Sequence, residues 1–195
     1  MYNKKMIDVL AKLFGSKTRV KMLRLFLANK VSAFTLAEIV KRTKVAKEAV
    51  RKELALLAKV GLLSTEGKGK DKKWSADSKF AYLRQLENLV LESGESDSHF
   101  IADKLKKAGD IKMIVVAGAF VPDAPNGDVD ILIVGNRLTQ PKVDRVVAEI
   151  EANFGRELRF AMFTPEDFTY RMDIQDRLLR DVFDYPHEII VDKLI

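Results

Sequence analysis

Two aspartates stand where their type and spacing could do chemistry. Asp128 and Asp130 are two residues apart at the start of an expected strand over residues 131–134. Because side chains alternate along a strand, both carboxylates point to one face while Val129 points to the other. Two adjacent carboxylates repel each other unless a cation lies between them. The pair is therefore a candidate Mg²⁺ site, at which substrate phosphates would complete the coordination shell.

The same two aspartates have a simpler explanation. They follow a turn that contains Pro122, Pro125, Asn126 and Gly127. Acids placed after such a turn can cap the strand without binding any ion. Spacing alone favours the capping role over the metal site.

Basic residues form the second candidate site, in the N-terminal half. On an expected helix that begins at Ala46, Arg51 has the paired donors that match a guanine edge, and Lys47 and Lys52 can contact phosphates. Further lysines follow in the glycine-bearing run GKGKDKK. The expected DNA contacts are Lys47, Glu48, Arg51, Lys52, Lys68, Lys70, Lys72 and Lys73. The alternative is that these lysines only form a solvated helix face next to a polar loop. We favour DNA binding because the helix, the loop and the N-terminal half as a whole are all basic.

The elements that position these bases can be read from caps and periodicity. Ser16 caps a helix to residue 29, and Thr35 with Glu38 forms a capping box before a short helix that ends near residue 44. The third helix, from residue 46, ends at Gly61. Two strands, 62–66 and 74–76, then form a hairpin around the basic run, with Trp74 packed against the helices. Three helices followed by a basic hairpin are typical of a winged helix-turn-helix, whose second motif helix enters the major groove.

A helix over residues 80–91 closes this half. Leu83, Leu86 and Val90 form one apolar stripe, and Tyr82 with Leu89 forms another. The second stripe is a candidate homodimer seam, since DNA-binding folds of this kind usually read two half-sites. Packing against the second domain explains the stripe equally well.

Net charge divides the chain near residue 90. Residues 1–90 hold 21 Lys and Arg against 8 Asp and Glu, a net charge of +13, whereas residues 91–195 hold 13 against 20, a net charge of −7. Opposite charges indicate two domains with different partners, the first a polyanion. The polar stretch at residues 93–98 marks the expected boundary.

Composition excludes several classes of chemistry. The sequence has no Cys, which excludes disulfides, thiolate zinc sites and cysteine nucleophiles, and its two His residues, His99 and His187, stand in no ligand spacing. Apolar stretches are too short to cross a bilayer, and the N-terminus lacks the pattern of a signal peptide. We expect a cytoplasmic protein without membrane spans.

The C-terminal half alternates helices and strands. Helices are expected over residues 100–108 and 141–154, with strands over 111–117 and 131–134, and Thr164 with Pro165 starts a further helix. Its apolar residues are expected in the core: Phe168, Met172, Leu178, Leu179, Val182 and Phe183.

Gly118-Ala119, a loop, and Asp128-Val129-Asp130 before an apolar strand resemble the nucleotidyltransferase signature of the DNA polymerase beta superfamily. Together with the stretch at residues 155–168, the chain is similar to prokaryotic transcriptional regulators that join a winged helix to a small nucleotidyltransferase-like domain. This resemblance implies that Gly118 and Ala119 lie against a nucleotide triphosphate and that Asp128 and Asp130 hold Mg²⁺.

Two departures from that family pattern weaken the expectation of catalysis. Ala119 replaces the serine that hydrogen-bonds phosphate in active members. The third carboxylate also lacks a clear counterpart, because the expected inward position holds Arg159, or Glu157 if the register shifts by two. An arginine there would pair with the aspartates and compete with a metal ion.

The sequence thus predicts an α+β protein with a winged-helix domain (residues 1–92), a linker (93–98) and a small nucleotidyltransferase-like α/β sheet domain (99–195). Its predicted function is DNA-binding transcriptional regulation, with a degenerate, regulatory second domain. The predicted partners are double-stranded DNA, a second copy of the chain, and a nucleotide or protein effector. No cofactor is required, although Mg²⁺ and a nucleotide remain candidate ligands. One alternative is an active Mg²⁺-dependent nucleotidyltransferase, related to toxin–antitoxin pairs, in which Asp128, Asp130 and Glu157 are the catalytic acids. The other alternative is an interaction module whose basic half binds an acidic protein.

Overall fold

The computed structural model describes residues 6–91, 95–121 and 128–194. Helices and short strands mix along the chain, with two separate sheets, so the predicted α+β class is confirmed. The chain divides into two compact units. Among the described residues, the N-terminal unit holds residues 6–91 and 149–156, and the C-terminal unit holds residues 95–121, 128–148 and 157–194.

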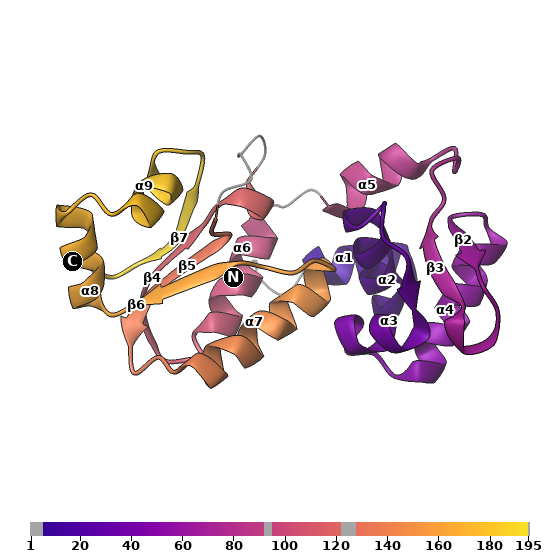
Figure 1. The fold of residues 1–195 in the computed structure, drawn as a ribbon, viewed down its shortest axis with the longest axis horizontal. Helices are drawn as coiled ribbons and strands as arrows, with labels where there is room; N and C mark the ends of the chain where they lie inside the picture. Colours follow the sequence, from indigo (N-terminus) through magenta and orange to yellow (C-terminus); the bar gives the residue numbers. More distant parts are fainter. Residues whose placement is uncertain (1–5, 92–94, 122–127, 195) are drawn as a thin grey trace. The chain divides into compact units, whose positions relative to one another are not determined.

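The N-terminal unit combines helices with one antiparallel sheet (Figure 1). Its strands pair in the order β1-β3-β2. In chain order its elements are α1 (Met6–Leu13), α2 (Lys17–Ala28), β1 (Phe34–Thr35), α3 (Leu36–Thr43), α4 (Lys47–Lys59), β2 (Leu63–Glu66), the 3₁₀ turn η1 (Gly69–Asp71), β3 (Lys73–Ala76) and α5 (Leu83–Leu91).

Local capping fixes where these helices begin. The Ser16 hydroxyl accepts the N–H of Arg19 at the start of α2 (3.1 Å), as its position predicts. Thr35 and Glu38 form the predicted capping box of α3. This helix ends at Lys44, whose backbone is left-handed (φ 52°), and only residues 44–46 separate it from α4. Two helices joined by so short a turn form a helix-turn-helix pair in the geometric sense.

The core of the N-terminal unit lies between α2, α4 and the sheet. Val50, Leu54 and Leu57 are buried on one face of α4, confirming the predicted stripe, and they join a cluster that contains Phe26. Trp74 is partly buried against this cluster, also as predicted. Residues 149–156, although distant in sequence, belong to the same unit. One contact that joins them to it is a hydrogen bond from the Asn29 side-chain amide to the carbonyl of Gly155 (2.6 Å).

The last helix of this unit starts later than the sequence predicts. Residues 80–82 precede α5, because the chain first makes a turn at Asp77. The Asp77 carboxylate accepts the N–H of Lys79, and its carbonyl accepts the N–H of Phe80. The expectation of a helix from residue 80 was therefore wrong by three residues.

The C-terminal unit holds a mixed four-stranded sheet in the order β6-β5-β4-β7 (Figure 1). Strands β5 and β6 are parallel and are joined by a helical crossover, while the other pairs are antiparallel. In chain order the elements are α6 (Glu95–Leu105), β4 (Asp110–Val116), the 3₁₀ turn η2 (Gly118–Phe120), β5 (Ile131–Asn136), α7 (Gln140–Phe154), β6 (Phe160–Phe163), α8 (Pro165–Asp173), α9 (Arg177–Phe183) and β7 (Glu188–Asp192). Of these, the last residues of α7, from 149 on, are assigned to the N-terminal unit.

Strand β5 is the centre of this unit. Its residues Ile131 to Val134 are all fully buried, so side chains on both faces of the strand are covered. On one face Leu132 and Val134 pack with Phe168 of α8 and Leu179 of α9. Met172 was expected in this core but is 42 % exposed, because it lies in the last turn of α8 and lines a surface pocket.

Helix α6 begins at Glu95, five residues before the predicted start. Its first turn is held by a contact that sequence periodicity does not reveal, from the Ser98 hydroxyl to the Glu188 carboxylate of β7 (2.9 Å). Residues 95–98 of the expected linker are therefore helical, and residues 93 and 94 lie outside the described residues.

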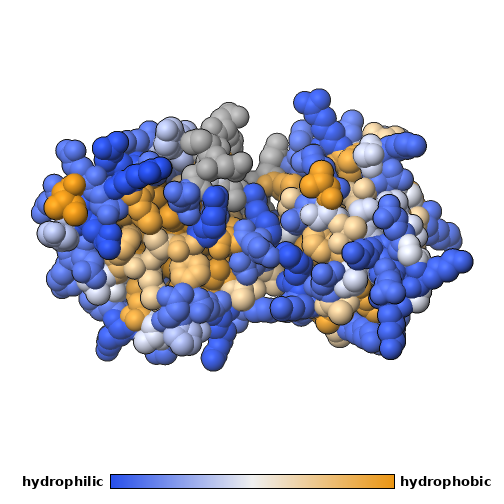
Figure 2. All heavy atoms as spheres, viewed as in Figure 1, coloured by the Kyte–Doolittle hydropathy of each residue, from blue (hydrophilic) through white to orange (hydrophobic). Residues whose placement is uncertain are grey.

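The two units differ in the surface that they present. Figure 2 shows mostly hydrophilic side chains over β2, β3 and α4, and apolar side chains gathered over the visible part of the C-terminal sheet. Within the described residues, each helix is too short or too polar to serve as a membrane span.

Candidate functional site

The outer face of α4 carries four of the eight predicted DNA-contact residues. Because Val50, Leu54 and Leu57 face the core, Lys47, Glu48, Arg51 and Lys52 are all exposed. The Arg51 guanidinium donates to the Glu48 carboxylate one turn earlier (2.6 Å). Such an exposed pair contributes little to stability, so it can open when a stronger anion approaches.

The β2–β3 hairpin carries the other predicted bases. Lys68, Lys70 and Lys73 are exposed, while Lys72 is half-buried with its ammonium 5.2 Å from the centre of the Trp74 ring. A cation over an indole face is attracted by the ring quadrupole, which holds Lys72 close to the sheet. The hairpin thus presents one anchored and three solvated cations.

One hollow brings the helix and the hairpin together. It has a volume of about 790 Å³ and is lined by Lys47 and Arg51 of α4 and by Lys70 and Lys72 of the hairpin. Its remaining lining comes from the start of α3 and from the hairpin: Thr35, Leu36, Ala37, Val40, Gly69 and Trp74. Four of the eight predicted contact residues therefore converge, whereas Glu48, Lys52, Lys68 and Lys73 do not line this hollow.

The first turn of α4 adds donors to the same region. Ala46 occupies the N-cap position, and in the described structure no side chain caps this helix end. The first backbone N–H groups of a helix have no partner within the helix, and they carry a partial positive charge. This end of α4 therefore suits a phosphate oxygen.

The two aspartates of the C-terminal unit lie in different environments. Both precede β5, and Asp130 is only 2 % exposed whereas Asp128 is exposed. Asp130 accepts three hydrogen bonds from Arg159: from its backbone N–H (2.9 Å) and Nε (3.2 Å) to Oδ2, and from Nη2 to Oδ1 (3.1 Å). The prediction that an arginine would pair here is confirmed for Asp130.

Strand register explains this pairing. The carbonyl of Arg159 accepts the N–H groups of both Asp130 and Ile131, just before the parallel β5–β6 ladder begins at Ile131 and Phe160. Arg159 therefore lies beside Asp130 although 29 residues separate them. The hydrogen bond to Asp130, and then the charges of Asp130 and Asp128, raise the pKa of the Arg159 guanidinium above its ordinary value.

Gly118 has a structural reason to be glycine. Its backbone is left-handed (φ 47°), and a Cβ atom there would lie 2.6 Å from Oδ1 of Asp130. Any larger residue at position 118 would therefore collide with the buried Asp130 carboxylate. Ala119 follows in the same turn, but its side chain and the predicted turn residues Pro122, Pro125, Asn126 and Gly127 lie outside those the structure describes.

Arg159 competes with a Mg²⁺ ion for Asp130. Both oxygens of Asp130 already accept hydrogen bonds from a guanidinium, which competes with a metal ion for the same lone pairs. Glu157, the candidate third acid, is exposed and precedes β6. Among the described residues, no three acidic or histidine side chains lie close enough together to hold a metal ion.

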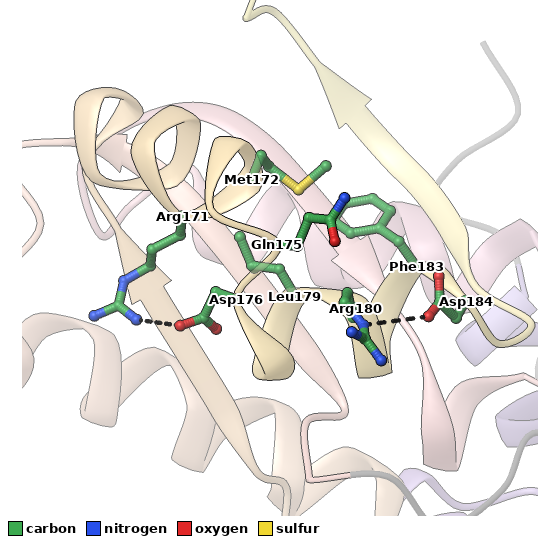
Figure 3. Close-up of a pocket in the computed structure, with 8 residues that line it drawn as sticks. All are labelled: Arg171, Met172, Gln175, Asp176, Leu179, Arg180, Phe183 and Asp184. Carbon is green, nitrogen blue, oxygen red and sulfur yellow. Dashed lines mark hydrogen bonds and ion pairs between the residues drawn. The ribbon is translucent and has the colours of Figure 1, made fainter.

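A smaller pocket between α8 and α9 was not predicted from the sequence. Its volume is about 350 Å³, and Figure 3 shows Met172, Leu179 and Phe183 among the side chains that line it. At its edge Arg171 pairs with Asp176 (2.9 Å), and Arg180 pairs more loosely with Asp184 (3.8 Å). Each cation has an acid beside it, so the pocket has no charge preference that would select a ligand.

The apolar wall of the larger hollow was also missed. Its sequence signal is weak: Leu36 and Val40 are four residues apart on α3, as are Lys47 and Arg51 on α4. Each pair is an ordinary amphipathic pattern, and only the packing of α3, α4 and the hairpin makes them line one hollow.

Comparison of the chain with protein-family models, with curated proteins and with solved structures finds no match.

Proposed function

We propose that the protein is a DNA-binding transcriptional regulator, and that its N-terminal unit is a winged helix that binds double-stranded DNA. The observation that carries this proposal is the convergence of Lys47 and Arg51 on α4 with Lys70 and Lys72 on the hairpin around one hollow. A duplex that enters this face meets the helix and the hairpin at once. The positive charge of residues 1–90 would speed the encounter.

Chain topology supports the winged-helix assignment. The order α2, β1, α3, α4, β2, β3 with an antiparallel β1-β3-β2 sheet gives a short turn between α3 and α4 and a hairpin directly after α4. In helix-turn-helix proteins the second helix of the pair lies in the major groove. Here that helix is α4, whose exposed face holds the basic residues.

Each side chain then has a distinct part in binding. Arg51 leaves its exposed pair with Glu48 and donates two hydrogen bonds to a guanine edge. Lys47 and the uncapped first turn of α4 contact backbone phosphates, as do the hairpin lysines. Once Arg51 has left it, the Glu48 carboxylate would be free to accept a hydrogen bond from a cytosine amino group.

The test is fluorescence anisotropy of the full chain with a duplex from its own promoter region and with a scrambled duplex, at two salt concentrations. If about six phosphates are neutralised, the logarithm of the association constant falls with the logarithm of salt with a slope of about −5. Equal binding to both duplexes, with affinity lost at physiological salt, would contradict the proposal.

Variants separate base contacts from phosphate contacts. Arg51→Ala should cost about 1–3 kcal/mol on the promoter duplex and little on the scrambled one. Lys70→Gln should weaken binding to both duplexes and make the salt slope shallower by about 1. Lys59→Gln, a change at an exposed lysine in the last turn of α4 outside the hollow, is the matched control.

For the C-terminal unit we propose a regulatory or partner-binding role in place of nucleotide transfer. The bidentate pairing of Asp130 with Arg159 supports this role, because it occupies the carboxylate that a transferase would give to a metal ion. The test is incubation with radiolabelled nucleoside triphosphate and Mg²⁺. Label transfer that is lost on combining Asp128→Asn with Asp130→Asn would establish the enzyme instead.

A further inference from the structure

We propose that the hollow between α3, α4 and the hairpin is a binding site for a small amphipathic organic anion, and that such a ligand releases the protein from DNA. The ligand class is an apolar, preferably aromatic body that carries a carboxylate, sulfonate or phosphate group. The release of DNA rests on the proposed function, whereas the binding of the anion does not.

Size and wall chemistry suit a small molecule. A volume of about 790 Å³ lies within the usual range of ligand sites, roughly 300–1,000 Å³. Leu36, Ala37 and Val40 of α3 form one apolar wall, and Trp74 of β3 lies among the lining residues. Leu36, Val40 and Trp74 are half-buried against the core, and Ala37 is exposed, so an apolar body in the hollow would cover the apolar surface that they still present to water.

The charge of the hollow selects the sign of the ligand. Four cations line it, and among the described residues of its lining none is acidic. Charges on a partly enclosed, low-dielectric wall act more strongly than on an open surface. In the pocket between α8 and α9 the aspartates that pair with the arginines are themselves lining residues, whereas Glu48, which pairs with Arg51, does not line the hollow.

Competition follows from shared residues. Lys47, Arg51, Lys70 and Lys72 are the proposed phosphate and base contacts, and an anion in the hollow would occupy the same donors. A ligand that binds only the DNA-free form must weaken DNA binding by mass action. DNA must in turn weaken ligand binding by the same factor.

The chain carries its own reporter of occupancy, because Trp74 is its single tryptophan. The probe is 8-anilinonaphthalene-1-sulfonate, and its uncharged counterpart N-phenyl-1-naphthylamine has the same rings without the sulfonate. We expect the sulfonate to quench Trp74 emission at saturation, and to bind about tenfold more tightly than the uncharged probe.

Three variants test the location. Lys70→Gln with Lys72→Gln should weaken the sulfonate about tenfold and leave the uncharged probe unchanged. Ala37→Glu, at an exposed position in the wall, should weaken the sulfonate further. Lys59→Gln with Lys79→Gln makes the same charge change on exposed residues of the same unit outside the hollow, and should change neither probe. Circular dichroism checks that each variant is folded.

The outcomes distinguish the two proposals. Equal affinity for both probes, or equal effects of the two double variants, overturns the anion site. If the sulfonate binds as expected but the chain fails to bind DNA, the site stands and the proposed function falls. If the protein binds DNA and saturating sulfonate leaves its affinity for DNA unchanged, the ligand does not release the protein from DNA and that part of the inference is wrong.

Discussion

Asp130 shows how a single neighbour decides the chemistry of a carboxylate. A buried acid needs either a cation or several hydrogen-bond donors. Arg159 supplies both, and Gly118 leaves room for the Asp130 side chain because it has no Cβ atom. The site is therefore an ion pair at the start of β5, and the charge of Asp128 also acts on Arg159.

Replacing Arg159 with methionine should destabilise the C-terminal unit. Asp130 would keep the backbone N–H of residue 159 but lose both guanidinium hydrogen bonds while remaining buried. The expected loss in free energy of unfolding is about 2 kcal/mol, below the value for a fully buried pair because the arginine is 49 % exposed. Urea denaturation measures it.

Arg180→Met is the control for this change. Arg180 also pairs with an aspartate, but Asp184 is exposed and lies 3.8 Å away, so no measurable loss is expected. Equal urea midpoints for wild type and Arg159→Met would mean that Asp130 does not depend on the guanidinium.

Among the elements, α3 has the best defined start. The backbone N–H and the hydroxyl of Thr35 both donate to the Glu38 carboxylate, at 2.7 and 2.8 Å. The hydrogen bond from the Thr35 backbone is the largest cause that lowers the pKa of Glu38, and the hydrogen bond from the Thr35 hydroxyl is the next. The charges of Lys73 and Arg42 lower this pKa further. The box matters for the candidate site because α3 supplies one wall of the hollow.

Stability should therefore depend on the ionisation of Glu38. Since its pKa is lowered in the folded protein, the contribution is complete above the pKa of the unfolded chain and is lost as pH falls through the lowered value. Glu38→Gln should cost about 0.5 kcal/mol at neutral pH, because the site is exposed and screened, and nothing in strongly acidic solution.

Thermal unfolding of both proteins across this pH range measures the difference. Glu66→Gln, at an exposed acid of β2 outside the capping box, is the control for the loss of one surface charge. A constant difference between wild type and Glu38→Gln at every pH would contradict the capping role.

At the scale of the whole molecule, the apolar stripe of Tyr82 and Leu89 stays exposed in the N-terminal unit, although the Tyr82 ring contacts Phe80 edge-on. Val90 is buried, and Leu83 and Leu86 pack on the core. By contrast, Tyr82 is 65 % and Leu89 48 % exposed. Exposed apolar side chains at this spacing are consistent with the predicted homodimer seam.

Leu89→Lys with Tyr82→Lys should convert the proposed dimer to a monomer, since a seam cannot bury two lysines. Analytical ultracentrifugation gives the mass. Loss of the second subunit should lower the apparent affinity for a duplex with two half-sites about tenfold or more. Val31→Lys, at a fully exposed apolar residue of the same unit, is the control. A wild-type chain that sediments as a monomer would refute the seam.

The sequence by itself determined features that depend on neighbours in the chain. The caps at Ser16, Thr35 and Thr164, the buried stripe of α4 and the β2–β3 hairpin all follow from side chains within a few residues, and each is confirmed. Boundaries set by local turns or distant contacts were missed, as at Asp77 and Ser98. The sequence left both Arg159 and Glu157 as candidates for the inward position beside the aspartates, because the register between two strands depends on residues that are distant in the chain.

Only the tertiary structure decided which residues meet. The parallel ladder of β5 and β6 set Arg159 against Asp130, and the packing of α3, α4 and the hairpin joined two ordinary amphipathic patterns into one cationic hollow. The first result depends on a contact between segments 29 residues apart, and the second depends on how consecutive elements pack against one another. Such contacts leave no periodic signal in either segment, because each side chain would look the same in its own helix or strand with a different neighbour.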